Sequence, residues 1–172
     1  MNTRIISFAI EAHQNVNHLY DGKPYSVHLA LVAMYAQKYI DLILESQHSN
    51  VKCAAWLHDT IEDCRLTYND IKKLAGEEVA ELVFALTNEK GRTRADRANA
   101  HYYDGIQKTP FAKYVKMCDR LANARYSKDN HSRMVEVYRK ENDHFIASVF
   151  PSNADKRIYQ PMILELKQIL NP

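Results

Sequence analysis

The chain has 172 residues, of which 46% are hydrophobic and 26% charged, and its formal net charge is +2. These values fit one globular domain and exclude the strongly basic surface that would indicate a nucleic-acid partner. No apolar run reaches the length of a membrane span and the N-terminus does not resemble a signal peptide, so we expect a cytoplasmic protein without a membrane partner. The three cysteines lack zinc-ligand spacing and indicate reduced thiols.

The chain contains only four glycines and five prolines, with long stretches that lack both, which predicts an all-α fold. Residues 17–25 are predicted to form a loop around the turn residues Asp21-Gly22, and Ser26 is a candidate N-cap for the helix that follows. Apolar residues at helical spacing predict helices, in chain order, over residues 3–16, 26–46, around His58-Asp59, 70–75, around 79–86, 98–107, from Thr109-Pro110 past Asn123, 134–149 and 154–170. His13 lies beside the first apolar stripe, and we interpret it as a histidine at the edge of the core.

The segment 54–63 places a His58-Asp59 pair at the end of an apolar run and a second acidic pair, Glu62-Asp63, just after it. In a helix, His58 shares a face with Glu62, and Asp59 shares a face with Asp63. Unpaired buried charge is costly, so a histidine and up to three carboxylates at the edge of a core indicate a divalent cation.

Two more residues of ligand type, His28 and Asp119, lie on apolar stripes elsewhere in the chain. Each alone is more often a hydrogen-bonded core residue. Together with His58 and Asp59 they predict one shared metal site. This mixed nitrogen and oxygen set suits Mn, Fe, Co, Ni or Zn and separates them poorly. No further histidine occupies a position near His58 expected for a second metal, so we expect one ion.

The order of these four residues resembles the H…HD…D signature of the HD superfamily of metal-dependent phosphohydrolases. Three segments are more closely similar to the hydrolase domain of the guanosine tetra- and pentaphosphate (alarmone) hydrolases, particularly the small single-domain members: Pro24–His28, His58–Asp63 and Val115–Asn123. The resemblance extends from about Ile5 to about Phe145. It implies an HD-type bundle of about seven to ten helices, with residues 1–172 as a single domain and 150–172 as a C-terminal packing helix.

The resemblance also implies a reaction, the removal of the 3′-pyrophosphate of guanosine tetra- or pentaphosphate. The preferred ion is Mn²⁺, with Fe, Co, Ni, Zn or Mg as alternatives. Glu62 or Asp63 would accept the proton of the attacking water, because the equivalent acidic pair is tied to hydrolysis in the alarmone hydrolases. The candidate substrate-binding residues are Lys23, Tyr25, Arg94 and Asn123. Arg94 belongs to the basic stretch 90–97, which is either a solvated loop or a phosphate-contacting lid.

Two departures from the alarmone hydrolases concern the choice of base. Many of those enzymes carry an Arg-Lys pair in the loop before G-x-P-Y and stack the arginine on guanine, whereas residues 15–24 contain no arginine. His18 and Tyr20 are candidates to stack instead, and Ala122 replaces the usual histidine of D-R-L-H-N. The expected partner is a small-molecule nucleotide, with no nucleic acid. Two alternatives remain open: a nucleotidase or phosphodiesterase for another nucleotide, and a non-catalytic nucleotide-binding protein.

Overall fold

The structure is a computed structural model that describes residues 3–171, and within them the chain is all-α apart from one short hairpin, as predicted. The α-helices are α1 (Thr3–Asn15), α2 (Ser26–Lys38), α3 (His48–Leu57), α4 (Thr60–Asp63), α5 (Tyr68–Ala75), α6 (Glu77–Leu86), α7 (Arg94–Arg97), α8 (Ala100–Lys108), α9 (Ala112–Asp129), α10 (Met134–Val149), α11 (Asn153–Ile158) and α12 (Gln160–Leu170). Two of them, α4 and α7, are single turns, so ten longer helices form the bundle. None of the described helices is long and apolar enough to cross a membrane.

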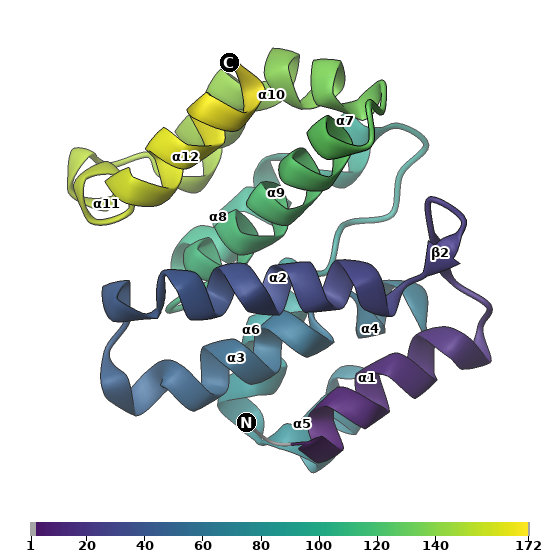
Figure 1. Ribbon diagram of the computed structural model, residues 1–172. Helices are drawn as coiled ribbons and strands as arrows, with labels where there is room; N and C mark the ends of the chain where they lie inside the picture. Colours follow the sequence, from purple (N-terminus) through teal and green to yellow (C-terminus); the bar gives the residue numbers. More distant parts are fainter. Residues whose placement is uncertain (1–2, 172) are drawn as a thin grey trace.

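Helix α9 is the centre of the bundle and packs on α2, α3, α10 and α12 (Figure 1). Its side chains are buried on several faces, as expected for a helix enclosed by other helices. The Tyr114 hydroxyl donates a hydrogen bond of 2.5 Å to the carbonyl of Ala36, which joins α9 to α2. Asp119 lies halfway along α9, so a carboxylate is placed at the meeting point of several helices.

The only strands in residues 3–171 are β1 (Leu19–Tyr20) and β2 (Lys23–Pro24), which pair antiparallel between α1 and α2. The two residues between them, Asp21 and Gly22, have φ values of 52° and 75°. Left-handed backbone at both positions is typical of the two-residue hairpin turn, and Asp and Gly tolerate it. The predicted turn residues are therefore confirmed, although the short strands around them were not predicted.

Several predicted helix boundaries were wrong. Helix α2 ends at Lys38, and residues 40–47 contain two short 3-10 helices, η1 (Ile40–Leu42) and η2 (Glu45–Gln47), instead of a continuation. The apolar periodicity continues there because Ile40 and Ile43 are still buried, although the backbone is no longer α-helical. Ser26 is not the N-cap, since Tyr25 takes that position without a side-chain hydrogen bond.

The other two errors involve proline. Helix α9 begins at Ala112, after Phe111 in left-handed conformation, and not at Thr109-Pro110. The predicted helix over 154–170 is divided into α11 and α12, because Pro161 lies in the first turn of α12. At Pro161 the missing N–H cannot donate to the preceding turn, so this residue starts a helix more readily than it continues one. At Pro110 the left-handed backbone of Phe111 delays the start of the helix to Ala112.

The C-terminal part of the chain covers the opposite end of the bundle from α1 (Figure 1). Helix α12 packs on α9 and α10, and its Met162 and Leu166 are fully buried. Among the residues that the structure describes, none from α11 or α12 lines the cavity beside Asp119, so the contribution of these two helices to the site is to hold α9 in place.

Candidate metal centre

The four predicted metal ligands meet at one place. His28 is the third residue of α2, His58 and Asp59 form the link between α3 and α4, and Asp119 lies in the middle of α9. The Nε2 atoms of His28 and His58 are 3.2 Å apart. Asp59 Oδ2 lies 2.9 Å from His58 Nε2, and Asp119 Oδ1 lies 3.4 Å from His28 Nε2. The tertiary structure thus brings together residues that are up to 91 positions apart in the sequence.

The spacing of these atoms fits a divalent cation. Ligands bonded to one ion at about 2.0–2.2 Å stand roughly 3.0–3.5 Å from one another, and the separations from the Nε2 atoms of His28 and His58 to each other and to the two carboxylates run from 2.9 to 3.9 Å. The ligand atoms of His28, His58 and Asp119 all lie within 4.8 Å of each other. His58 Nδ1 is 3.0 Å from the carbonyl of Ala55, a contact that places the proton on Nδ1 and leaves the Nε2 lone pair facing the cluster. The donor set therefore could hold a metal.

Hydrogen bonds from neighbouring side chains orient both carboxylates. The Tyr25 hydroxyl donates to Asp59 Oδ2 at 2.5 Å. Asp119 accepts from Asn123 Nδ2 at 2.5 Å and from Lys116 Nζ at 2.9 Å. Sequence reasoning missed Lys116, although its signal was present: a lysine one turn before an aspartate shares that residue's helix face.

The electrostatics keep the carboxylates ionised. Burial raises the pKa of Asp119, but the nearby charges of Lys116, His58 and His28 outweigh it and hold that pKa well below its usual range. Burial lowers the pKa of His28, and the hydrogen bonds to Asp119 and Asp59 more than reverse this, raising it to about 9. Burial also raises the pKa of Asp59, but the charges and hydrogen bonds of His58 and His28 hold it well below its usual range. Both carboxylates are therefore deprotonated at neutral pH, the state in which they bind a cation.

A cavity of about 880 Å³ opens beside this cluster. Of the predicted substrate-binding residues, Tyr25, Arg94 and Asn123 line it, and Lys23 does not. Lys23 lies on the hairpin, where its Nζ donates to the hydroxyl of Tyr126 at 2.8 Å. The volume is sufficient for a nucleotide-sized ligand.

Glu62 and Asp63 both line the cavity, in different surroundings. The carboxylate of Glu62 accepts two hydrogen bonds from Asn88, one from its backbone N–H at 3.0 Å and one from its side chain at 3.1 Å. Asp63 is partly buried, and burial together with the charges of Asp59 and Glu62 raises its pKa to about 7. A carboxyl group with such a pKa can both accept and release a proton near neutral pH.

The basic stretch 90–97 is only partly directed at the cavity. Arg94 lines the cavity but is paired with Glu141, with Nε–Oε1 and Nη2–Oε2 distances of 3.0 and 3.1 Å. Arg120 Nη1 also donates to Glu141 at 3.2 Å. Glu141 lies on α10, and no sequence signal identified it. The phosphate contact predicted for Arg94 thus requires the guanidinium to exchange this carboxylate for a ligand.

The two residues suggested as stacking partners for a base are placed differently. His18 lines the cavity, and its ring stacks on that of Tyr25 with centroids 4.0 Å apart. Tyr20 is not among the lining residues, and its hydroxyl donates to Asn123 Oδ1 at 2.9 Å. Both polar ends of the Asn123 amide are therefore engaged, one by Tyr20 and one by Asp119. His18 is the better placed of the two candidates.

Comparison with known proteins gives consistent results. Residues 6–147 match the family model described as the HD domain. The guanosine-3′,5′-bis(diphosphate) 3′-pyrophosphohydrolase MESH1 of Danio rerio is 32% identical over 123 residues, which cover 70% of this chain and 65% of that protein. The guanosine-3′,5′-bis(diphosphate) 3′-pyrophosphohydrolase of Aquifex aeolicus is 33% identical over 126 residues, which cover 71% of this chain and 17% of that protein. The matched region thus spans about two thirds of the first relative and a small part of the second.

A solved structure supports the same architecture. It is described as "A metazoan ortholog of SpoT hydrolyzes ppGpp and plays a role in starvation responses", and it superposes with a TM-score of 0.70 over 98% of this chain and 94% of that one. The sequence identity is 21%, so this likeness shows a shared fold.

Proposed function

This chain belongs to the HD domain family, and from that premise we propose that it is a metal-dependent hydrolase of guanosine 3′,5′-bis(diphosphate). The reaction removes the 3′-pyrophosphate. The bond between the 3′-oxygen and phosphorus breaks, an oxygen from water bonds to that phosphorus, and the 3′-oxygen leaves with a proton. The relatives named for this reaction, which match about 70% of this chain, support the choice of substrate.

The observation that carries the proposal is the cluster of His28, His58, Asp59 and Asp119 at the wall of a nucleotide-sized cavity. A divalent metal is implied by the family, and we propose Mn²⁺ as the ion that these four residues hold. Such an ion supplies Lewis-acid polarisation of a phosphoryl oxygen and activation of water. The single-domain interpretation of residues 1–172 stays a prediction.

The chain's own side chains supply the remaining functions. Glu62 and Asp63 are the proposed catalytic pair, because they face the cavity one turn from the cluster and one of them can take a proton from water. Tyr25 and Asn123 orient the two aspartates. Arg94 would contact a phosphate oxygen after leaving Glu141. A rise in KM in R94A, compared with R92A as a matched control outside the cavity lining, would test that contact.

The decisive experiment is a substrate screen with purified protein and Mn²⁺. We expect guanosine 3′,5′-bis(diphosphate) to yield GDP and pyrophosphate, with little turnover of deoxynucleoside monophosphates or cyclic nucleotides. Turnover of one of those compounds, with guanosine 3′,5′-bis(diphosphate) untouched, would refute the proposed substrate and keep the phosphohydrolase assignment.

One observation favours the second candidate, a nucleotidase or phosphodiesterase acting on another nucleotide. His18 is the aromatic residue of the arginine-free loop that reaches the cavity, and its ring is already stacked on Tyr25. An imidazole in a stack has less surface to offer a purine than a free arginine would have. Comparison of kcat/KM for adenosine and guanosine polyphosphates would measure how strongly the base is selected.

A further inference from the structure

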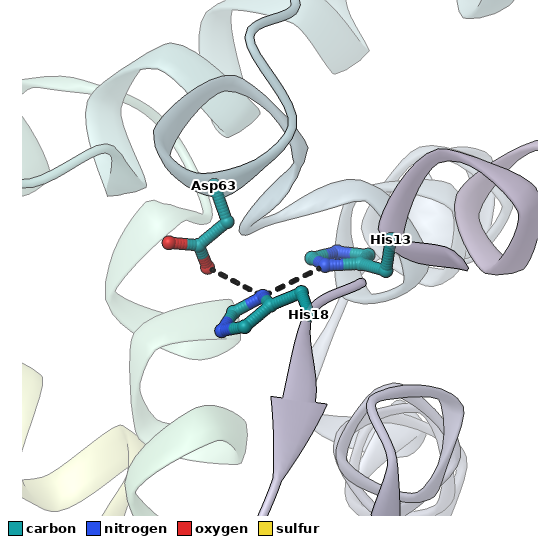
Figure 2. A group of neighbouring side chains, drawn as sticks. All are labelled: His13, His18 and Asp63. Atoms are coloured by element: carbon teal, nitrogen blue, oxygen red, sulfur yellow. Dashed lines mark hydrogen bonds and ion pairs between the residues drawn. The ribbon is translucent and has the colours of Figure 1, made fainter. Parts of the chain in front are cut away.

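A second group of ligand-type atoms lies beside the first, formed by His13, His18 and Asp63 (Figure 2). The Nδ1 atoms of His13 and His18 are 3.1 Å apart, and Asp63 Oδ2 is 3.5 Å from the same Nδ1 of His18. One ligand atom from each residue lies within 4.8 Å of those of the other two. These separations match those of the His28 and His58 cluster, so the same coordination geometry fits both places.

The end of α1 explains how two histidines five residues apart come to face each other. Asn17 has a left-handed φ of 53°, the N–H of Asn17 donates to the carbonyl of Gln14, and the N–H of His18 donates to the carbonyl of His13. This pair of hydrogen bonds is the Schellman motif, which ends a helix and folds the next residue back onto the last turn. An apolar contact usually closes the motif, and here two imidazoles occupy that position.

Hydrogen bonding among the three groups leaves one contact unsatisfied. Nδ1 of His18 carries either one proton or one lone pair, yet it faces both His13 Nδ1 and Asp63 Oδ2. His13 is 1% exposed, and the partner of its Nδ1 is His18 Nδ1. A cation shared by the three atoms would use the lone pairs of both imidazoles and one carboxylate oxygen together.

We propose that His13, His18 and Asp63 form a second divalent-cation site of the Zn²⁺ type, with its fourth position open to the cavity. Two nitrogens and one oxygen with an open position are the ligand set of many accessible zinc sites. The site is open because the side chains of His18 and Asp63 are 32% and 27% exposed and both line the cavity. The Tyr25 ring stacks on both imidazoles while its hydroxyl reaches Asp59, so this one side chain connects the two sites.

This second site does not depend on the proposed reaction, because it can be measured without nucleotide. It does affect the roles within the catalytic pair. The Asp63 oxygen that binds a cation cannot accept a proton from water, so Glu62 has to do so when the second site is filled.

The test is metal stoichiometry. Protein stripped with a chelator is dialysed against Zn²⁺ and analysed by mass spectrometry, and Co²⁺ is used in parallel because its visible absorption reports four-coordinate binding. We expect two equivalents in the wild type, one in H18A, and one in D119N, with the four-coordinate Co²⁺ absorption present in D119N and lost in H18A. H101A is the matched control, since His101 is exposed and far from the ligand residues in sequence, and it should retain two equivalents.

Two results would overturn the proposal: a wild type that binds one equivalent, or an H18A protein that still binds two. D63N is a second test variant in case H18A does not fold, because asparagine keeps the shape of the side chain and removes the charge that binds the cation. D63N should also lose one equivalent while its circular dichroism spectrum stays that of the wild type, and retention of both equivalents would contradict the proposal.

Discussion

The His28–His58–Asp59–Asp119 cluster and the His13–His18–Asp63 group use the same kinds of atoms at the same spacing but are built differently. The first takes its residues from α2, the α3–α4 link and α9, and balances two imidazoles with two carboxylates. The second takes both imidazoles from the end of α1 and its cap and has one carboxylate. Since each carboxylate adds a negative charge for the ion, the first cluster should bind a divalent cation more tightly than the second.

The pKa values of the histidines reflect this difference in the number of carboxylates. Hydrogen bonds to two carboxylates overcome burial and raise the pKa of His28 to about 9. Burial dominates at His13 and lowers its pKa to about 4, with only Asp59 acting in the opposite direction. Without metal, the first cluster thus balances its charge with protons, whereas the second avoids charge on His13. Two groups of residues with similar ligand geometry can therefore respond to pH in opposite ways.

The largest expected effect is the loss of the first cluster's function. In D119N one charged ligand is removed, and we expect kcat to fall by about 10³-fold, equivalent to about 4 kcal/mol of transition-state stabilisation. The measurement is pyrophosphate release in Mn²⁺ from guanosine 3′,5′-bis(diphosphate). Wild-type activity in D119N would show that Asp119 is not part of the working site, and H101A serves as the control.

The next effect distinguishes the role of Glu62 in proton transfer from the role of Asp63 in binding the second cation. We expect E62Q to lose about 10²-fold in kcat, because an amide cannot accept a proton, and to retain both metal equivalents. D63N should lose one equivalent and keep more activity than E62Q, because Glu62 can still accept the proton. Steady-state kinetics and metal analysis on the same preparations measure both quantities. If E62Q also lost the second cation, the separation of roles between these neighbours would be incorrect.

A third prediction concerns the pH dependence of stability in chelated protein. The unfolded-state pKa of His13 is near 6.5 and the folded-state pKa is about 4, so the unfolded chain takes up a proton that the folded protein does not as pH falls through this window. His13 therefore contributes stability above pH 6.5 that is lost progressively towards pH 4. Between pH 7 and pH 5 this loss amounts to about 2 kcal/mol.

Asp63 opposes this effect, because its raised pKa of about 7 stabilises the fold as pH falls, so the His13 contribution has to be isolated by difference. Urea denaturation of wild type and H13Q at both pH values provides that difference. The stability deficit of H13Q should shrink by about 2 kcal/mol from pH 7 to pH 5. An unchanged deficit would mean that His13 titrates normally in the folded protein.

The smallest effect tests the helix cap that builds the second site. Asn17 has a φ of 53°, which a β-branched residue adopts only with strain, so N17V should destabilise the protein by about 1–2 kcal/mol and weaken the second cation. N17G is the matched control, because glycine adopts this conformation freely. Denaturation midpoints and Zn²⁺ titration should rank N17G with the wild type and N17V below both. Equal behaviour of the two variants would show that the cap conformation does not build the second site.

The sequence revealed the first cluster because its residues lie on apolar stripes, where burying a polar side chain is costly unless it has a partner. His28, His58, Asp59 and Asp119 could be named that way, and the structure brings them together. It did not reveal the partner of Arg94, because Glu141 lies on α10 and the pairing depends on how α7 and α10 pack. Lys23 was assigned to the site by proximity in sequence, whereas the hairpin turns it towards Tyr126.

The second group shows the limit most clearly. His13 was interpreted as a histidine at the edge of the core, and one ion was expected because no further histidine occupies a position near His58 expected for a second metal; both stay predictions until metal stoichiometry is measured. The sequence by itself determined an all-α chain and the residue types of the candidate metal centre, since helical periodicity and buried polar residues are local signals. Only the tertiary structure decided that α4 would carry Asp63 to the cap of α1, since contacts between separate helices are set by packing and leave no periodic trace in the chain.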